Sequence, residues 1–202
     1  MGGYADLPLR DVLEEVAAQR PAPGGGCAAA WALALSAGLV EMAARFTLAR
    51  PRYAGVHERM LDVKSAAAEA RRNALACAER DAEAYAPVLE ALKLPPQHPE
   101  RTERLRVARS EAAEVPLAVA EEAAAVAALA AEAARTGSEH LEGDAVTGAV
   151  MAEAACRAAG RLVEINLAGA PDDPRLGRVA EAARRAGAAR EEALVAREEA
   201  VR

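Results

Sequence analysis

The sequence predicts an all-α protein: a bundle of about six helices, several of them long and bent, in a single domain over residues 1–202. Hydrophobic residue types make up 52% of the chain but aromatic residues only 2%, so alanine supplies much of the apolar surface and strand-favouring residues are scarce. Alanine buries little area per side chain. Stability must therefore come from closely approaching helices or from area buried between subunits, and we expect dimerisation through the helices richest in small residues.

The first two helices are separated by a loop rich in proline and glycine. A first helix is predicted over Leu7–Gln19, because Asp6 can cap it and apolar residues recur at helical spacing behind that cap. The second helix is predicted from Cys27 to about Phe46. It contains so many alanine, serine and glycine residues that neighbouring backbones can approach it closely, and we expect it to be central and buried.

Prolines mark the boundaries of the next two helices. The third helix follows a break at residues 50–55 and should kink at Pro87, and three prolines at positions 95, 96 and 99 end it. The fourth helix should bend or restart around Pro116. The expected bounds are about Val56–Leu92 for the third helix and, from a start at Glu100 or Thr102, about Arg135 for the end of the fourth.

The last two helices follow turns at residues 136–138 and 172–174. One is predicted to start at Gly143 or Asp144 and to reach about Leu167. The other is predicted over Leu176–Val201 and should be exposed, since charged residues alternate along it. No repeat of solenoid length is evident.

Charge and targeting patterns exclude several classes of function. The formal net charge is −6, with 31 acidic and 25 basic residues that are interspersed, so we expect neither a nucleic-acid partner nor a membrane surface. No signal peptide is visible and no segment resembles an uncharged membrane span. The 3 cysteines and 3 histidines lack disulfide-framework or metal-ligand spacing, which predicts no metal site and a reducing, cytoplasmic location.

The most informative segment is Pro21-Ala22-Pro23-Gly24-Gly25-Gly26-Cys27. Three glycines allow a close backbone approach, and the helix behind them would point free N–H groups and its positive dipole end into the loop. A carboxylate, carbonyl or phosphate oxygen could bind there. The alternative is a helix-helix turn in which glycine only relieves crowding. The segment matches neither the Walker nor the dinucleotide-binding pattern.

Three acidic residues stand among apolar helical sequence and are the candidate acid-base groups: Glu41, Asp81 and Asp144. A carboxylate on a packed face needs a partner, a raised pKa or a ligand. For Glu41 the alternative is an ion pair with Arg45 four residues later. For Asp81 the alternative is an ordinary solvated helix face, and for Asp144 it is a helix N-cap.

Two further polar residues have a ligand-binding and a structural interpretation. Asn166 can present an amide to a polar ligand or help to end its helix. Cys27 stands at a helix N-terminus, where a thiolate is stabilised and a nucleophile is conceivable. A small filler at a tight turn is the alternative for Cys27.

Several short motifs, taken in order, resemble the cyclodeaminase domain of formiminotransferase-cyclodeaminase and its stand-alone relatives, the methenyltetrahydrofolate cyclohydrolases. The resemblance spans nearly the whole chain. It is carried by residues 21–29, which are similar to the family's Pro-x-Pro-Gly-Gly-Gly-Ser stretch, and by the following segments: residues 39–47, 81–85, 94–95, 115–117, 143–145 and 165–167.

The resemblance implies a helical homodimer or higher oligomer that binds a tetrahydrofolate derivative as substrate at or near the subunit interface, with no prosthetic group. Two reactions are implied. One is hydrolysis of the 5,10-methenyl bridge to 10-formyltetrahydrofolate, and the other is loss of ammonia from 5-formiminotetrahydrofolate with ring closure. We expect the hydrolysis, because no formiminotransferase domain accompanies this chain. A non-catalytic folate-binding or scaffold protein is the further alternative.

Under this resemblance the candidate site residues acquire roles. Asp144 and Glu41, with Asp81 third, are the expected acid-base or charge-stabilising groups. Arg45, or a nearby lysine or arginine, is the expected partner of the glutamate tail. The remaining expected substrate-binding residues are Pro23, Gly24, Gly25, Gly26, Cys27 and Asn166.

The chain departs from the family pattern at three positions. Cys27 replaces the usual serine, Leu162 stands where an asparagine is usual, and the approach to Asp144, which includes Leu141, lacks the usual Gly-Asn and serines. Loss of buried polar groups changes substrate recognition, so these departures predict an altered preference or a lost activity.

Overall fold

The computed structural model describes residues 3–196 as a set of helices, with no strand in that range. The α-helices are α1 (Leu9–Ala17), α2 (Gly25–Leu48), α3 (His57–Ala84), α4 (Ala86–Lys93), α5 (Arg101–Ala112), α6 (Glu114–Thr136), α7 (Glu142–Asn166) and α8 (Pro174–Val195). Three short 3-10 helices are η1 (Tyr4–Asp6), η2 (Pro51–Val56) and η3 (Glu139–Leu141).

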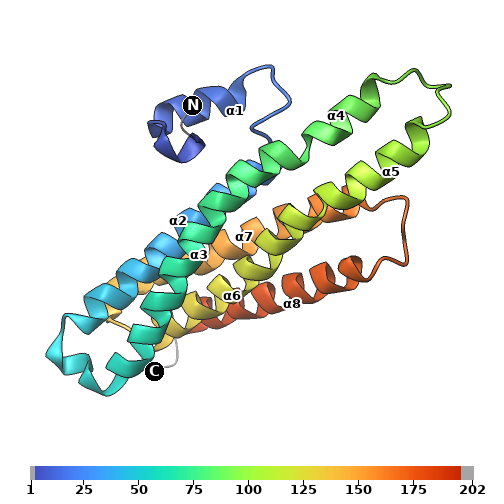
Figure 1. The fold of residues 1–202 in the computed structure, drawn as a ribbon. Helices are drawn as coiled ribbons and strands as arrows, with labels where there is room; N and C mark the ends of the chain where they lie inside the picture. The colour runs from blue at the N-terminus through green and yellow to red at the C-terminus, as the bar shows by residue number, and fades with distance from the viewer. Residues whose placement is uncertain (1–2, 197–202) are drawn as a thin grey trace.

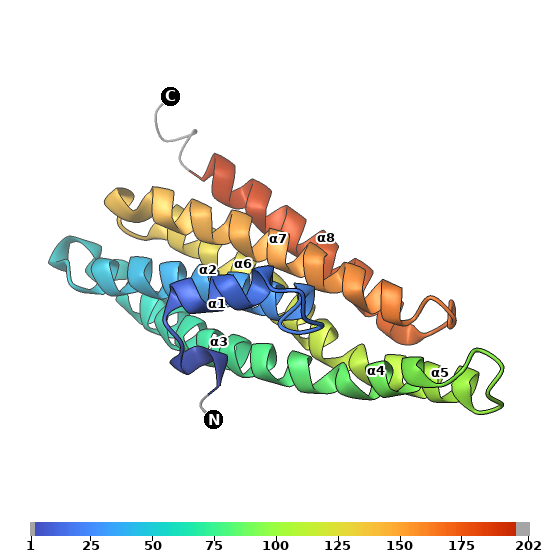
Figure 2. The same ribbon diagram turned by 90° about the horizontal axis from the view of Figure 1, so that it is seen from above.

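The helices form six rods, which confirms the predicted fold class. Only Tyr85 separates α3 from α4, and only Ala113 separates α5 from α6, so each pair is one long, bent rod. Figure 1 shows α2, α3, α6, α7 and α8 side by side along the molecule, with the α4–α5 pair extending beyond them at one end. Helix α1 stands apart from this bundle in Figure 1, and in the view from above it overlaps α2 in projection (Figure 2).

The core is built from small side chains, as the composition predicts. Helix α2 lies against α3, α6 and α7, and most of its small residues are buried. The Ser36 hydroxyl donates to the Gly148 carbonyl of α7 at 2.8 Å. A Cβ atom at Gly148 would come within 3.2 Å of a Val40 methyl group, so glycine is what lets these two helices approach so closely. The prediction of a central, buried second helix is confirmed.

Both predicted proline breaks exist, but each lies shortly before the proline. Pro87 is in the first turn of α4, and Pro116 is the third residue of α6. Proline has no N–H and is tolerated within a first helical turn, whereas the residues before it are pushed out of the helical conformation. The helices therefore stop at Tyr85 and Ala113 instead of kinking at the prolines themselves.

Neither of the two aspartates considered as helix N-caps is one. Helix α1 begins at Leu9 behind Pro8, and the Asp6 carboxylate instead accepts the Gly3 N–H at 3.2 Å within η1. Asp144 is inside the first turn of α7, whose N-cap is Leu141. A carboxylate there still benefits from the helix dipole. The last helix starts at Pro174, and its predicted end at Val201 lies outside the described residues.

Helix α2 contradicts the expectation that no segment resembles a membrane span. Its 24 residues include a window of mean hydropathy 1.6, so by length and composition it qualifies as a membrane span, contrary to the sequence-based prediction. However, 61% of that window is buried inside the bundle. This is the environment of a core helix.

Candidate functional site

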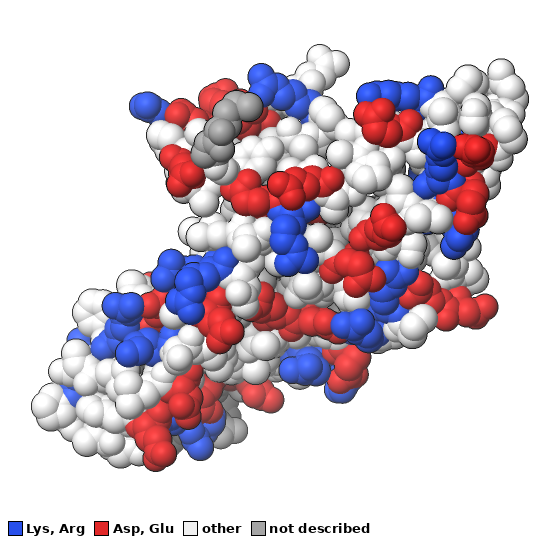
Figure 3. All heavy atoms as spheres, viewed as in Figure 1, with Lys and Arg blue, Asp and Glu red and all other residues white. Residues whose placement is uncertain are grey.

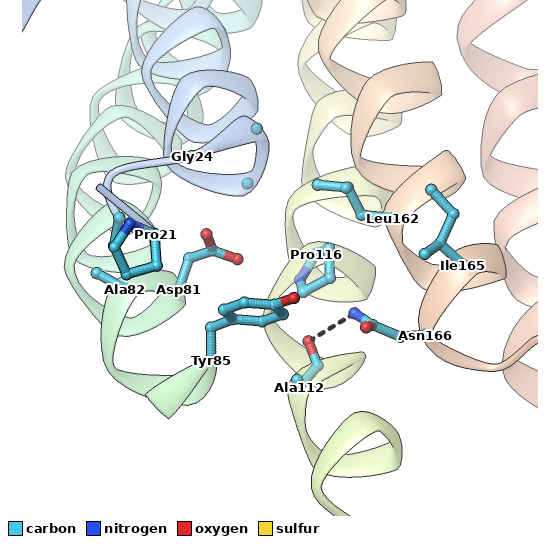
Figure 4. Close-up of a pocket in the computed structure, with 13 residues that line it drawn as sticks. Pro21, Gly24, Asp81, Ala82, Tyr85, Ala112, Pro116, Leu162, Ile165 and Asn166 are labelled. Atoms are coloured by element: carbon cyan, nitrogen blue, oxygen red, sulfur yellow. Dashed lines mark hydrogen bonds between the residues drawn. The ribbon is translucent and has the colours of Figure 1, made fainter. Parts of the chain in front are cut away.

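The glycine loop opens onto a cavity of about 270 Å³, which we call the glycine-loop cavity. Figure 4 shows its two walls. One wall is formed by the loop and by Asp81, Ala82 and Tyr85 of α3 and its C-cap. The opposite wall carries side chains from α5, α6 and α7: Ala112, Pro116, Leu162, Ile165 and Asn166.

The N-terminus of α2 points its backbone donors at this cavity. The N-cap, Gly24, has no side chain that could accept them. Gly25 and Gly26 line the cavity, and neither N–H has an acceptor among residues 3–196. A Cβ atom at Gly26 would lie 2.1 Å from an Asp81 carboxylate oxygen. Glycine is therefore needed at this position for Asp81 to reach the helix end.

Asp81 is the carboxylate that this arrangement places in the cavity. It accepts the Cys27 backbone N–H, so a side chain of α3 serves in place of the missing cap of α2. The Cys27 thiol approaches the same carboxylate at 3.5 Å. Burial raises the pKa of Asp81 and outweighs the opposing effect of these hydrogen bonds. Asp81 therefore holds a proton at a higher pH than an ordinary aspartate.

Asn166 lies on the opposite wall because of a proline. In a regular helix the N–H of residue 116 would bond the carbonyl of Ala112, but Pro116 has no N–H. The Asn166 side-chain amide donates to that carbonyl at 3.4 Å instead (Figure 4). The amide oxygen of Asn166 is left for another partner. The helix-ending role considered for Asn166 is compatible with this contact, since it is the last residue of α7.

Pro23 and Cys27 belong to the loop but do not line the cavity. Pro23 is buried and follows a cis peptide bond. The Cys27 thiol is fully buried and donates to the Ala78 carbonyl at 3.2 Å. Burial raises its pKa to about 11. The thiol thus stays protonated at neutral pH, which favours the structural interpretation over a nucleophile.

Glu41 lies at a different level of the bundle. It is 16 residues beyond Gly25 on α2, about 24 Å along the helix axis. Its side chain is buried and accepts hydrogen bonds from Arg45 at 2.9 Å and from Arg71 at 3.1 Å. Burial alone would raise the pKa of Glu41, but the two guanidinium groups lower it below its usual value. The ion-pair interpretation of Glu41 and Arg45 accordingly describes the contacts seen.

Asp144 is also distant from the cavity within one chain. It precedes Asn166 on α7 by 22 residues, about 33 Å at the helical rise. The structure therefore brings together Gly24, Gly25, Gly26, Asp81 and Asn166. It does not bring Glu41, Arg45 or Asp144 to them within a single chain.

Two cavity residues were missed as site candidates. Tyr85 is 37% exposed at the cavity wall, and Pro116 lacks the N–H that would otherwise bond the Ala112 carbonyl. The spacing of Asp81 and Tyr85, four residues apart on one helical face, is a signal that could have found the tyrosine. Leu162, which stands where the family usually has an asparagine, is an apolar residue of the cavity wall. One of its methyl carbons is 3.8 Å from the position that a Cβ atom at Gly25 would occupy.

No three His, Cys, Asp or Glu side chains are grouped as a metal site within residues 3–196. The three cysteines are buried and unpaired. The arrangement offers backbone N–H donors, one proton-holding carboxylate and one amide around a single cavity. Such a set can bind a planar polar ligand and exchange a proton with it.

Comparison with known proteins gives consistent matches. The family model for formiminotransferase-cyclodeaminase matches residues 8–185. The formimidoyltransferase-cyclodeaminase of Mus musculus is 36% identical over 120 residues, which cover 57% of this chain and 22% of the mouse protein. The methenyltetrahydrofolate cyclohydrolase of Methylorubrum extorquens is 30% identical over 168 residues, covering 81% of each protein.

A solved structure agrees over almost the full length. The crystal structure of formiminotetrahydrofolate cyclodeaminase from Thermotoga maritima matches with a TM-score of 0.87 at 27% identity, covering 98% of this chain and 99% of that chain. The chain therefore spans most of the bacterial proteins but only 22% of the mouse protein's length.

Proposed function

Because this chain belongs to the formiminotransferase-cyclodeaminase family, we propose that it is a one-carbon folate enzyme that hydrolyses 5,10-methenyltetrahydrofolate to 10-formyltetrahydrofolate. The observation that carries the proposal is the Asp81 carboxylate, held at the N-terminus of α2 on the wall of a cavity of about 270 Å³. The M. extorquens relative, which matches over 81% of both proteins, is named for this hydrolysis.

The chemistry suits a carboxylate at that place. The methenyl bridge is a cationic carbon between N5 and N10, and it must be attacked by water. Asp81 in its ionised form accepts a proton from that water as the new C–O bond forms, and its negative charge stabilises the cationic bridge. The C–N5 bond then breaks as the remaining hydroxyl proton passes to N5 and the C=O bond forms, which leaves the formyl group on N10. One proton is released for each water consumed.

The glycine loop and Asn166 have binding roles in this proposal. The free N–H groups of Gly25 and Gly26 can donate to carbonyl or carboxylate oxygens of the ligand. The free amide oxygen of Asn166 can accept from a ring N–H or an amino group of the pterin. Tyr85 offers a ring face against which a planar heterocycle can stack.

The alternative reaction is loss of ammonia from 5-formiminotetrahydrofolate. The T. maritima protein that matches over nearly its whole length carries the name of this activity. In that reaction Asp81 would act first as an acid, because the departing amine must be protonated. A raised pKa serves this role as well. A non-catalytic folate-binding protein is the third possibility.

Replacing Asp81 tests the proposal. We expect Asp81→Asn to lower kcat for hydrolysis of the methenyl substrate about 100- to 10,000-fold, the range for loss of a general base. Glu83→Gln is the matched control, because Glu83 is exposed on the same helix and does not line the cavity. In the wild type, activity should fall on the acid side at a pH above 3.8, the usual value for aspartate, because the pKa of Asp81 is raised.

The same assays separate the alternatives. Turnover is followed by loss of the methenyl chromophore, and ammonia release from the formimino substrate reports the deaminase. Binding of either compound without turnover would support a folate-binding protein. If Asp81→Asn keeps the wild-type kcat, Asp81 is not the catalytic group. In that case Asp144→Asn and Glu41→Gln are the variants to compare next. We also propose a cytoplasmic location, since three free buried thiols suit a reducing compartment.

A further inference from the structure

A second cavity continues from the glycine-loop cavity between α5 and the end of α7. Its volume is about 380 Å³, and we call it the α5–α7 groove. Asn166 lines both cavities, so one side chain forms their common border. The polar groups of the groove come mainly from α5: Thr102, Arg106, Arg109 and Ser110.

Arg109 is an unpaired cation on this groove. Its guanidinium makes no hydrogen bond or ion pair with any residue in the range 3–196. The other arginine of the groove, Arg106, is engaged, because it donates to both carboxylate oxygens of Glu103 at 2.8 and 2.6 Å. Arg109 is therefore the groove's free bidentate donor.

The one acidic side chain of the groove does not cancel this charge. Both carboxylate oxygens of Asp173 accept hydrogen bonds from Arg175, at 2.9 and 2.7 Å. These bonds lower the pKa of Asp173 to about 2. Asp173 is thus an ionised but fully paired group. The local excess of charge in the groove is the guanidinium of Arg109.

The two cavities lie on one continuous face of the α5–α6 rod. Arg109 precedes Ala112 by three residues, and Ala112 precedes Pro116 by four. Residues with this spacing share a helical face. Ala112 and Pro116 line the glycine-loop cavity, and Arg109 is one turn, about 5 Å, further along. A ligand whose head occupies the glycine-loop cavity can therefore extend past Asn166 to Arg109.

We propose that the α5–α7 groove binds the carboxylates of an acidic tail on the substrate, with Arg109 as the principal cation and the hydroxyls of Thr102 and Ser110 beside it. This inference rests on the proposed folate function and assigns the tail to a different residue from the one expected from the sequence. Arg45, the expected partner, is already bonded to Glu41 and lies on α2 far from both cavities.

Two matched substrates test the proposal: 5,10-methenyltetrahydrofolate and 5,10-methenyltetrahydropteroate, which lacks only the glutamate. We expect Arg109→Gln to raise KM and Kd for the glutamate-bearing compound about tenfold, as for loss of an exposed charge-assisted contact. The Kd of the pteroate and kcat for both compounds should stay unchanged. Arg109→Lys should recover part of the affinity, because it keeps the charge but loses the bidentate geometry.

The control is Arg72→Gln, which removes an exposed arginine that lines neither cavity. Binding is measured by titration, independently of turnover. A wild-type protein that binds the folate without converting it would overturn the hydrolase and leave the tail site standing. Equal losses for both compounds, or no loss for either, would overturn the tail site while the hydrolase stands. A wild-type protein that binds neither compound would overturn both.

Discussion

At the scale of single residues, two carboxylates serve opposite purposes because their partners differ. Glu41 and Asp81 are both acidic residues of apolar helical sequence. Two arginines contact Glu41 and lower its pKa, whereas among residues 3–196 Asp81 meets a thiol and a backbone N–H, and burial raises its pKa. The first carboxylate stays ionised and holds helices together. The second holds its proton at a higher pH than an ordinary aspartate, which favours acid-base chemistry.

Glu41→Gln tests the structural role of the first carboxylate. We expect the variant to lose about 1 kcal/mol of unfolding free energy at neutral pH, a low value because Arg45 and Arg71 are 65% and 40% exposed. The pKa of Glu41 is lower in the folded state than its usual 4.5. The contribution of Glu41 to the unfolding free energy is therefore fully present above pH 4.5 and disappears as the pH falls through the folded-state pKa.

Urea unfolding of wild type and variant between acid and neutral pH measures this difference. Glu192→Gln provides the control, because Glu192 is exposed and has no charged partner among the described residues. A stability difference between wild type and Glu41→Gln that does not shrink toward acid pH would contradict the assigned electrostatic origin.

At the scale of helices, one arginine connects α8 to both α5 and α6. Arg175, at the start of α8, donates to the carbonyl and hydroxyl of Ser110 at 2.7 Å each and to Glu114 at 2.6 Å. It also holds Asp173, the N-cap of α8. One side chain that is 14% exposed thereby ties α8 to the joint between α5 and α6.

Arg175→Met is therefore expected to lower the unfolding free energy by about 2 kcal/mol, since it leaves a partly buried carbonyl and carboxylate without their charged donor. Arg178→Met is a matched control one turn along α8. Within the part of the chain that the structure describes, its one partner is Glu121, and its side chain is 53% exposed, so we expect little change. Urea denaturation midpoints compare the two variants. Equal midpoints would show that Arg175 does not clamp the joint.

The helices themselves could be predicted from the sequence because their signals are local. Apolar spacing placed the second helix within two residues of α2 at each end, Gly25–Leu48. Proline clusters located the α4–α5 turn. The positions of the breaks within the long rods are predicted less precisely, because Pro87 and Pro116 act on the residues before them. The breaks at Tyr85 and Ala113 accordingly lie two and three residues before these prolines.

The candidate site could be predicted only in part, for the same reason. The triglycine loop is a local signal and does line the cavity. Which carboxylate meets it is decided by helix pairing, since Asp81 comes from another helix, 55 residues after Gly26. The apolar sequence around Glu41 predicts its burial, but its second arginine, Arg71, is 30 residues away. Partners at such separations are set by tertiary packing.

At the scale of the whole molecule, the surface carries charge of both signs and two apolar stripes. Blue and red side chains alternate over the face seen in Figure 3. On α1, Leu9, Leu13 and Val16 are 71%, 60% and 40% exposed, at a spacing that places them on one helical face. On α2, Leu35 and Phe46 are 61% and 50% exposed. Exposed apolar stripes of this kind mark association surfaces.

We propose that these stripes are covered by a second copy of the chain, so that the protein is a homodimer. The core consists largely of alanine, which buries little area per residue, and a subunit interface of about 1,200–2,000 Å² would add to that burial. Leu35→Glu should therefore shift the molecular mass in solution from dimer to monomer and lower the thermal midpoint, because each interface would bury two unpaired carboxylates.

Leu61→Glu separates this effect from a general effect of added charge. Leu61 is 49% exposed, but its neighbours on the outer face of α3 include Glu58, Asp62 and Glu69, so it does not belong to an apolar stripe. Light scattering coupled to size exclusion, at micromolar concentration, gives the mass of each variant. A monomeric wild type, or dissociation by both substitutions alike, would contradict an interface on α1 and α2, whereas a dimer lost only in Leu35→Glu locates it there.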